Sequence, residues 1–207
     1  MDFSQINWTP KLISEIGTIT FSTLIAYGLL DQGITIWKQR SGRSVYTPLF
    51  VFLAGTRISA MLYGFADNSI PLIYNGIVTG LAMIPMFTGL WKYKGFSRFE
   101  KALCYITTVL NIVSWLTPYE AEIFLFFSLA LMGFAFKQPW EIHKERSSGV
   151  VRLQLLIVTF FNSGFWLVYG YWADKWVIKI TAPGFFLIFL LTSVLWFRYR
   201  QPLPQTS

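Results

Sequence analysis

Seven long apolar segments separated by short polar ones make up most of this sequence. Within them apolar residues follow one another without alternation, as in "FLIFLLTSVLWF", so helices are favoured over the strands of a closed β-barrel. A helix of about 20 residues crosses the apolar core of a bilayer. We therefore expect an all-α integral membrane protein with seven transmembrane helices. The expected spans are roughly residues 14–36, 45–66, 69–91, 101–118, 120–142, 150–173 and 176–197.

The composition agrees with this pattern. Hydrophobic residues make up 54% of the chain and aromatic residues 19%, whereas charged residues reach 13%, about half their usual share. A soluble fold of this composition would have too little polar surface to cover itself. The N-terminal region carries Asp2, Lys11 and Glu15 and has no small-residue cleavage site, so a cleaved signal peptide is not expected. The single cysteine, Cys104, is expected to be a packing residue.

The basic residues predict the orientation of the chain. Alternate flanks of the expected spans carry Lys38, Arg40, Arg43, Lys92, Lys94, Arg98, Lys101, Lys144, Arg146, Arg152, Arg198 and Arg200. The remaining flanks carry Lys11, Lys175 and Lys179 with the acids Asp67, Glu120, Glu122 and Asp174. Because basic loops stay on the cytoplasmic side, we expect the N-terminus outside and the C-terminus in the cytoplasm, in a plasma or inner membrane. Basic residues divided in this way form no continuous stripe for nucleic acid.

The chain contains an internal repeat. When it is shifted along itself by 106 positions, identical residues coincide without a gap. The coinciding residues include Phe21-Ser22 with Phe127-Ser128, Gln32 with Gln138, Ile36 with Ile142, Lys38 with Lys144, Arg40 with Arg146, and Tyr63-Gly64 with Tyr169-Gly170. Three spans are an odd number, so a second copy following directly would insert upside down. One further span restores the orientation and gives a 3+1+3 arrangement of parallel repeats.

This arrangement divides the chain into four parts. Residues 1–98 form the first three-helix repeat, 99–119 the linking transmembrane helix, 120–200 the second repeat and 201–207 a cytoplasmic tail. In transporters built from such repeats, the solute binds near the middle of the bilayer, between the repeats.

Several short motifs recur in the same order in both copies. A "K-x-[KR]-S" turn follows the first helix of each repeat, at residues 38–41 and 144–147, and the second helices end in "LYG" and "WLVYG". The third helix of the first copy contains "NG" at residues 75–76. These features resemble the PQ-loop superfamily, and specifically its seven-span SWEET branch of sugar transporters, over nearly the whole chain. The proline-glutamine pair itself is intact in neither copy.

The resemblance implies a carrier that moves a mono- or disaccharide by alternating access, without obligatory energy coupling and without a cofactor. Trp166 matches the tryptophan that stacks on the sugar ring, and Ala60 is its small counterpart in the first copy. Asn75 matches an asparagine that contacts sugar hydroxyls, and Thr181 occupies the equivalent position. Thr56 and Asn162, also equivalent, are expected either to line the cavity or to hydrogen-bond across helices.

Residues at the two ends of the expected pathway are assigned to gating. Asp31 and Lys137 occupy equivalent positions one turn inside the cytoplasmic face, where an ion pair would close the inner gate. Alternatively each reaches the interface separately. The full set of gating residues is Asp31, Lys137, Gln32, Gln138, Pro48, Pro139, Tyr63 and Tyr169.

Arg57 lies inside the apolar segment "LFVFLAGTRISAMLYGF", where a cation is costly and usually functional. Three interpretations remain open. It pairs with an acidic residue or with helix-end carbonyls and locks the bundle, or it faces the cavity and binds a carboxylate or phosphate of the solute. In the third it is a surface arginine whose side chain snorkels to the membrane interface.

Other classes of function are less well supported. The only histidine, His143, lies in a basic loop, and the sequence has no catalytic constellation or metal-binding spacing. Two alternatives to a sugar carrier are a proton-coupled carrier of amino acids or other carboxylates, with Asp31 as the proton site, and a membrane receptor resembling the KDEL receptor. One chain of seven spans can form a complete pathway, so homo-oligomers are possible without being required.

Overall fold

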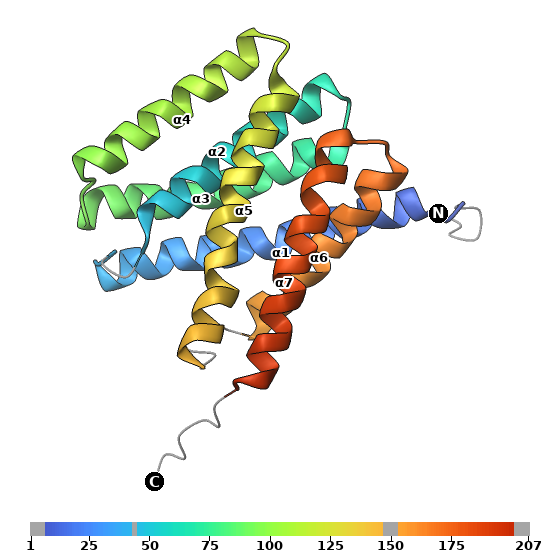
Figure 1. The fold of residues 1–207 in the computed structure, drawn as a ribbon. Coiled ribbons are helices and arrows are strands. Elements are labelled where there is room, and N and C mark those ends of the chain that lie inside the picture. Colours follow the sequence, from blue (N-terminus) through green and yellow to red (C-terminus); the bar gives the residue numbers. More distant parts are fainter. Residues whose placement is uncertain (1–6, 43–44, 147–152, 201–207) are drawn as a thin grey trace.

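The structure is a computed structural model that describes residues 7–42, 45–146 and 153–200. The described part consists of helices joined by short turns, without a strand, so the expected all-α class is confirmed (Figure 1). The helices are α1 (Pro10–Gln39), α2 (Thr47–Ala66), α3 (Ile70–Tyr93), α4 (Arg98–Leu116), α5 (Glu120–Glu145), α6 (Leu153–Trp172) and α7 (Trp176–Arg198). The expected cytoplasmic tail, Asp2, Arg43, Arg152 and the serine of the second turn motif, Ser147, lie outside the described residues.

Five of these helices have the length and apolar composition of membrane spans: α1, α2, α3, α6 and α7. Together they indicate an integral membrane protein. Helices α4 and α5 do not belong to this group. Helix α4 contains Thr107, Thr108, Asn111 and Ser114, and α5 has acidic residues in its first turn and ends in a charged segment. The expected number of seven spans therefore stays a prediction.

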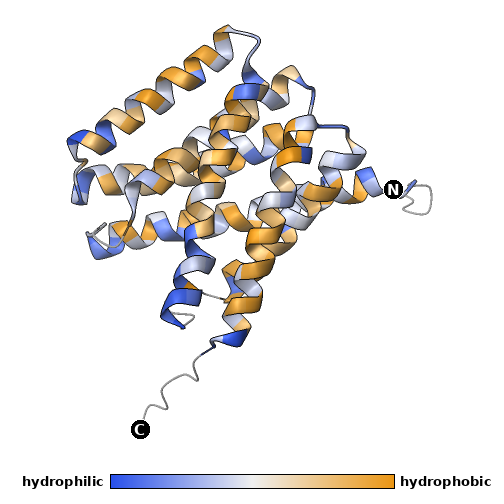
Figure 2. Ribbon diagram, in the orientation of Figure 1, coloured by the Kyte–Doolittle hydropathy of each residue, from blue (hydrophilic) through white to orange (hydrophobic). Residues whose placement is uncertain are grey.

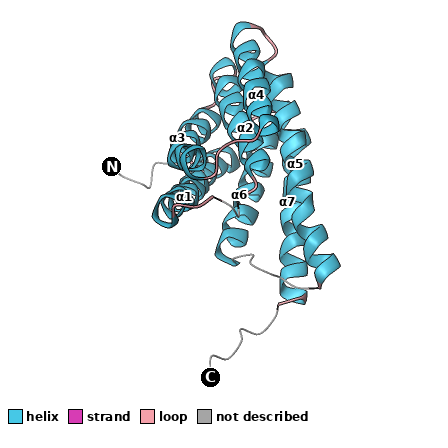
Figure 3. Cartoon of the chain, turned by 90° about the vertical axis from the view of Figure 1, so that its left-hand side faces the viewer, coloured by secondary structure: helices cyan, strands magenta, loops and turns pink. Residues whose placement is uncertain are grey.

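Six helices form a closed ring. Each contacts two neighbours, in the order α1, α3, α2, α5, α7, α6 and back to α1, and no other pair within this group is in contact among the described residues. Helix α4 lies outside the ring, against α2 and α5. The first three helices and the last three each form a triplet in which the third helix lies between the first and second. Figure 3 shows α1 and α3 together on one side and α5 and α7 together on the other.

The two ends of the ring differ in chemistry. The turns α2–α3, α4–α5 and α6–α7 lie together with the beginning of α1 at one end, here called the turn end (Figure 1). The C-terminal ends of α1, α3, α5 and α7 and the beginning of α4 are together called the basic end. They lie away from the turn end in two groups, α1, α3 and α4 at the left of Figure 1 and α5 and α7 at the bottom. Figure 2 shows hydrophilic segments in both groups of the basic end, a further one at the beginning of α5, and mostly hydrophobic helices between the ends.

The backbone repeats with the same offset of 106 residues as the sequence. Helices α2 and α6 end at Ala66 and Trp172, and α3 and α7 begin at Ile70 and Trp176. The non-glycine residues with positive φ among the described residues also form two pairs at this offset. Arg40 (φ 48°) corresponds to Arg146 (φ 49°), and Asn68 (φ 50°) corresponds to Asp174 (φ 56°). Because this left-handed region is unusual for residues other than glycine, the shared positions are informative.

Local signals in the sequence explain where the helices begin. The side chain of Thr9 accepts a hydrogen bond from the backbone N–H of Leu12, and Pro10 occupies the first turn of α1. Ser97 and Glu100 form a reciprocal capping box at the start of α4. At the other end of α1, Arg40 closes the helix in the left-handed conformation, as Arg146 does for α5.

Buried apolar residues form two clusters that are placed differently in the two triplets. One cluster joins the triplets near the turn end and comprises Ala60, Tyr63, Leu72, Phe124, Tyr169, Val177, Ile178 and Ala182. The other lies within the first triplet and comprises Ala26, Leu29, Ile36, Val45, Ala82, Met83, Met86 and Leu90. The buried residues that connect the triplets are therefore concentrated at the turn end.

Candidate functional site

Equivalent polar residues of α3 and α7 lie buried in the protein. Asn75 and Thr181, at the same position of the two repeats, are each 4% exposed. The Thr181 hydroxyl donates a hydrogen bond to the carbonyl of Val177 at 3.0 Å, and the Thr79 hydroxyl donates to the carbonyl of Asn75. Both residues are thus buried polar groups, and neither bonds to another expected binding residue among the described residues.

The second equivalent pair, Thr56 and Asn162, behaves asymmetrically. The Thr56 hydroxyl is 2.8 Å from the carbonyl of Phe52 in its own helix and 3.4 Å from that of Phe127 in α5. Thr56 therefore takes part in a contact between the triplets, which favours the interpretation of bonding across helices. The Oδ1 atom of Asn162 is buried and has no hydrogen-bond partner among the described residues. A buried amide oxygen without a partner is costly and is available to a ligand donor.

Trp166 and Ala60 lie at the cluster that joins the triplets. Ala60 is 1% exposed within this cluster, and Trp166 packs against it. The Trp166 ring meets the Tyr169 ring edge to face, with centroids 5.6 Å apart and an interplanar angle of 83°. The tryptophan and its small counterpart are therefore brought to the same cluster, one from each triplet.

Arg57 is a cation inside the protein without a counter-ion. It forms no salt bridge and no hydrogen bond with any described residue, and its Nε atom is buried. The backbone at this level is tightly packed, because a Cβ on Gly76 of α3 would lie 2.6 Å from the Arg57 carbonyl oxygen. The described residues thus provide no support for the interpretation of Arg57 as an internal lock.

The turn end is closed by polar contacts between the triplets. The Lys175 ammonium lies 2.7 Å from the Asp67 carboxylate and donates to the Asp67 carbonyl at 3.2 Å. The hydroxyls of Ser69 and Tyr169 share a buried hydrogen bond of 2.6 Å. These contacts join the α2–α3 turn to α6 and to the α6–α7 turn, so the two turns lie at the same end of the protein.

Tyr63 and Tyr169 both belong to this closure, although through different partners. Tyr63 stacks on Phe124 of α5, with ring centroids 5.6 Å apart, and is 6% exposed. Tyr169 is 2% exposed and bonds Ser69. The "LYG" and "WLVYG" motifs therefore place one tyrosine each in the contact between the triplets.

The expected Asp31–Lys137 ion pair is not formed in this structure. Lys137 is exposed and pairs with Glu141, one turn further along α5, at 3.5 Å, and its ammonium lies 5.8 Å from the centre of the Tyr46 ring. Asp31 is exposed as well. Helices α1 and α5 are not neighbours in the ring, which explains why equivalent positions on them do not meet here.

The remaining gating residues lie in the same half of the protein. Pro48 is buried in the first turn of α2, and Pro139 is buried inside α5. Gln32 and Gln138 are partly buried. The Tyr46 ring, which precedes α2, contacts Phe134 and Lys137 of α5 in this half of the protein.

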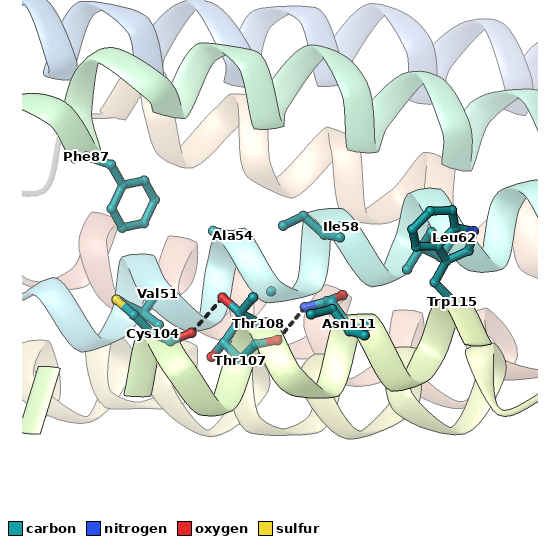
Figure 4. Close-up of a pocket in the computed structure, with 12 residues that line it drawn as sticks. Val51, Ala54, Ile58, Leu62, Phe87, Cys104, Thr107, Thr108, Asn111 and Trp115 are labelled. Carbon is teal, nitrogen blue, oxygen red and sulfur yellow. Dashed lines mark hydrogen bonds between the residues drawn. The ribbon is translucent and has the colours of Figure 1, made fainter. Parts of the chain in front are cut away.

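A pocket of about 420 Å³ lies elsewhere, along the outer side of α2 (Figure 4). Its lining combines α2, α4 and Phe87 of α3, and Figure 4 shows Thr107, Thr108 and Asn111 on α4 beside it. The Asn111 amide donates to the carbonyl of Thr107 at 2.9 Å, so this polar group is used within α4. Because the pocket lies between the ring and α4, it contains none of the expected binding residues.

A polar brace fixes the basic end of the first triplet. The Lys94 ammonium donates to the carbonyl of Val45 (2.9 Å) and to the hydroxyl of Thr47 (2.6 Å), and it pairs with Glu100 at 3.2 Å. Glu100 precedes the expected fourth span. The backbone N–H of Ser97, with the Thr47 hydroxyl and the Lys94 ammonium, lowers the pKa of the Glu100 carboxyl to about 2.

Sequence reasoning missed the partners that close the turn end. Ser69 carries no sequence signal for its bond to Tyr169, and Asp67 and Lys175 were considered only as flanking charges. Their opposite signs beside the equivalent turn residues Asn68 and Asp174 could have indicated a contact. Among the described residues, no group of three or more His, Cys, Asp and Glu side chains is placed to hold a metal ion.

Comparisons with protein-family models, with curated proteins and with solved structures find no match for this chain.

Proposed function

We propose that this protein is a membrane carrier in which two parallel three-helix repeats, joined by α4, move a small polar solute by alternating access. The observation that carries the proposal is the symmetric ring of six helices, which closes with the same order of contacts in both triplets. The shared helix ends and left-handed caps at the offset of 106 support the assignment of two repeats. In this proposal α4 crosses the membrane outside the ring and restores the orientation of the second triplet.

The distribution of charge supports an orientation with the turn end outside and the basic end in the cytoplasm, in a plasma or inner membrane. Most described lysines and arginines that flank the helices gather at the basic end (Figure 2). Basic flanks are retained on the cytoplasmic side during insertion.

The unequal closure of the two ends supports alternating access. Tyr63, Tyr169 and the Asp67–Lys175 pair join the triplets at the turn end, while Asp31 and Lys137 remain apart at the basic end. In the proposed cycle this conformation faces the cytoplasm. Closing the basic end and opening the turn end would expose the same interior to the outside.

The solute expected from the resemblance is a mono- or disaccharide. In this proposal Trp166 stacks on the sugar ring, Ala60 leaves room opposite it, and Asn75, Asn162 and Thr181 bond its hydroxyls. The buried positions of Asn75 and Thr181 and the unpartnered Asn162 oxygen support these roles. Movement down a gradient is the default, since no described feature requires an energy source.

One observation favours a second candidate function, a carrier of carboxylate solutes. Arg57 has no counter-ion among the described residues, and a solute carboxylate would supply one. If uptake is coupled to protons, Asp31 is the proposed proton site.

Uptake into proteoliposomes tests the proposal. The purified chain is reconstituted and offered radiolabelled glucose, sucrose and a panel of amino acids, with and without a pH gradient, beside protein-free liposomes. We expect saturable uptake. Trp166→Ala should abolish it, whereas Trp172→Ala, the same change at an exposed tryptophan, should preserve it. Saturable uptake of an amino acid but of no sugar would replace the first candidate by the second, and no saturable uptake of any solute would contradict a carrier.

A further inference from the structure

A cation without a counter-ion lies in the middle of α2. Each of the ion pairs of the described residues lies near a helix end or in a turn and uses another cation. Arg57 makes no hydrogen bond to a described residue, and its Nε atom is buried. A bare guanidinium in such a place lowers stability, and residues of this kind usually serve function.

Arg57 lies in α2 beside residues that make contacts within the ring. Its Nε atom is buried, while the residue as a whole remains partly exposed. Thr56 contacts the adjacent helix α5, and Ala60 belongs to the cluster shared by the triplets.

The charge in the interior is not balanced by the second repeat. Ser163 occupies the position equivalent to Arg57, and its hydroxyl donates to the carbonyl of Phe160 at 2.7 Å. The other interior candidates, Asn75, Thr181 and Asn162, are neutral hydrogen-bonding groups. Among these expected binding residues, Arg57 is therefore the one that carries a charge.

We propose that Arg57 binds the carboxylate of the transported solute, and that this solute is a small hydroxylated acid such as a sugar acid. The inference rests on the proposed carrier function and names its substrate class. A guanidinium binds a carboxylate through two parallel N–H···O bonds, which lysine cannot reproduce. The neutral side chains then bond the hydroxyls of the same molecule, so a neutral sugar leaves the cation unpaired and binds more weakly.

Binding to the full-length protein in detergent tests the inference with a matched pair of probes. Gluconate and glucose share a six-carbon hydroxylated chain and differ in the carboxylate. Affinities are measured by intrinsic tryptophan fluorescence at constant ionic strength. We expect gluconate to bind at least about ten-fold more tightly than glucose, because hydrogen bonds to charged groups are the stronger class. Equal affinities in the unmodified protein would overturn the inference.

Three variants assign the preference to Arg57. Arg57→Gln should bring the two affinities to within about two-fold, whereas Arg57→Lys should keep a reduced preference for gluconate. Arg98→Gln, the same change at an exposed site at the start of α4, should leave the preference unchanged. An Arg57→Gln protein that still prefers gluconate, or an Arg98→Gln protein that loses the preference, would contradict the assignment.

Thermal unfolding without ligand separates binding from a structural role. If the role of Arg57 is to bind a solute anion, its charge is unpaired in the absence of ligand. Removing this charge in Arg57→Gln should therefore raise or preserve the midpoint of thermal unfolding. If Arg57→Gln instead unfolds at markedly lower temperature or fails to fold, the gluconate preference of the Arg57→Lys variant provides the test. An Arg57→Lys protein with the full gluconate preference of the parent would overturn the bidentate contact.

The proposed transport function and this inference can fail separately. Gluconate that binds through Arg57 but is not taken up by proteoliposomes would refute the carrier and leave the anion site intact. Saturable glucose uptake that gluconate does not inhibit would support the carrier and overturn the anion site.

Discussion

The Asp67 carboxylate and the Lys175 ammonium lie 2.7 Å apart, although 108 residues separate them in the chain. Asp67 follows α2 and Lys175 precedes α7, so the contact joins the turn of one triplet to the turn of the other. Both side chains are partly buried, and the Lys175 ammonium also bonds the Asp67 carbonyl. The pair therefore holds the turn ends of the two triplets together.

Reversal of either charge should weaken this closure. Asp67→Lys and Lys175→Asp each place like charges together, whereas the double reversal restores an opposite pair. We expect both single variants to unfold at lower temperature and the double variant to recover, with a coupling energy of about 1 kcal/mol for a partly exposed pair.

The neighbouring ion pair provides the control for this experiment. Lys179 and Asp174 also form an ion pair, but within the second triplet alone. In a Cys104→Ser background, a cysteine replaces the buried Ser69 at the turn end. Reversal of Lys179 and Asp174 should leave the rate at which a thiol-reactive probe labels this cysteine unchanged, while Asp67→Lys increases it. Additive effects of Asp67→Lys and Lys175→Asp would mean that the pair does not couple the triplets.

A second ion pair is predicted for the opposite conformation. Asp31 and Lys137 occupy equivalent positions on α1 and α5, and Lys137 pairs with Glu141 in the present structure. If the basic end closes during transport, an Asp31–Lys137 contact stabilises that state. Uptake should be abolished by Asp31→Lys or Lys137→Asp alone and retained in the double reversal. Normal uptake by both single variants would exclude this gate.

Two equivalent glycines should be equally intolerant of a side chain. A Cβ on Gly64 would lie 2.8 Å from the Cβ of Leu72, and one on Gly170 would lie 2.8 Å from Cγ2 of Ile178. Gly64→Val and Gly170→Val should therefore each lower the unfolding midpoint by several degrees through overpacking. Gly133→Ala, where a Cβ meets open space, serves as the control, and a large loss there would show that the packing argument is wrong.

The Glu100 brace predicts a dependence of stability on acid. The Ser97 backbone N–H and the other donors hold the pKa of this carboxyl at about 2, below its ordinary value of 4.5. The carboxylate is then favoured in the folded state, so its contribution is complete above pH 4.5 and is lost as the pH falls toward 2. Glu100→Gln should unfold at lower temperature than the parent at pH 6. Its unfolding midpoint should also change less between pH 6 and pH 3 than that of the parent.

The exposed carboxylate of Glu122 on α5 is the control for this measurement. Glu122→Gln should retain the parent's dependence of the unfolding midpoint on pH. A Glu100→Gln protein whose midpoint falls with acid as steeply as the parent's would show that other carboxylates govern the effect.

Sequence reasoning predicted the repetitive part of the fold because the repeated signals are local. The "K-x-[KR]-S" turn marks the end of α1 and α5, and both helices close on an arginine in the left-handed conformation. The tyrosine-glycine pairs mark the ends of α2 and α6, where glycine allows the next helix to approach closely. Such signals are contained in a few consecutive residues and can be read without knowledge of the partner.

Contacts between the triplets could not be predicted in the same way. Tyr169 was expected in a gate, but its partner Ser69 lies 100 residues away and belongs to the other repeat. Strict symmetry would pair Asp31 with Lys137, whereas Lys137 forms its ion pair with Glu141 on its own helix. Partner choice at these positions depends on how the two triplets are inclined to each other, which neither periodicity nor the repeat determines.

The central claim is that the two triplets face the same way across the membrane, and labelling of introduced cysteines tests it most directly. In a Cys104→Ser background, single cysteines replace Asn68, Asp174, Arg40 and Arg146, which are all exposed. A membrane-impermeant maleimide is added to sealed, right-side-out cells or vesicles. We predict labelling of Asn68→Cys and Asp174→Cys from the outside and of Arg40→Cys and Arg146→Cys after the membrane is opened. Labelling of Asn68→Cys and Asp174→Cys from opposite sides would contradict the account.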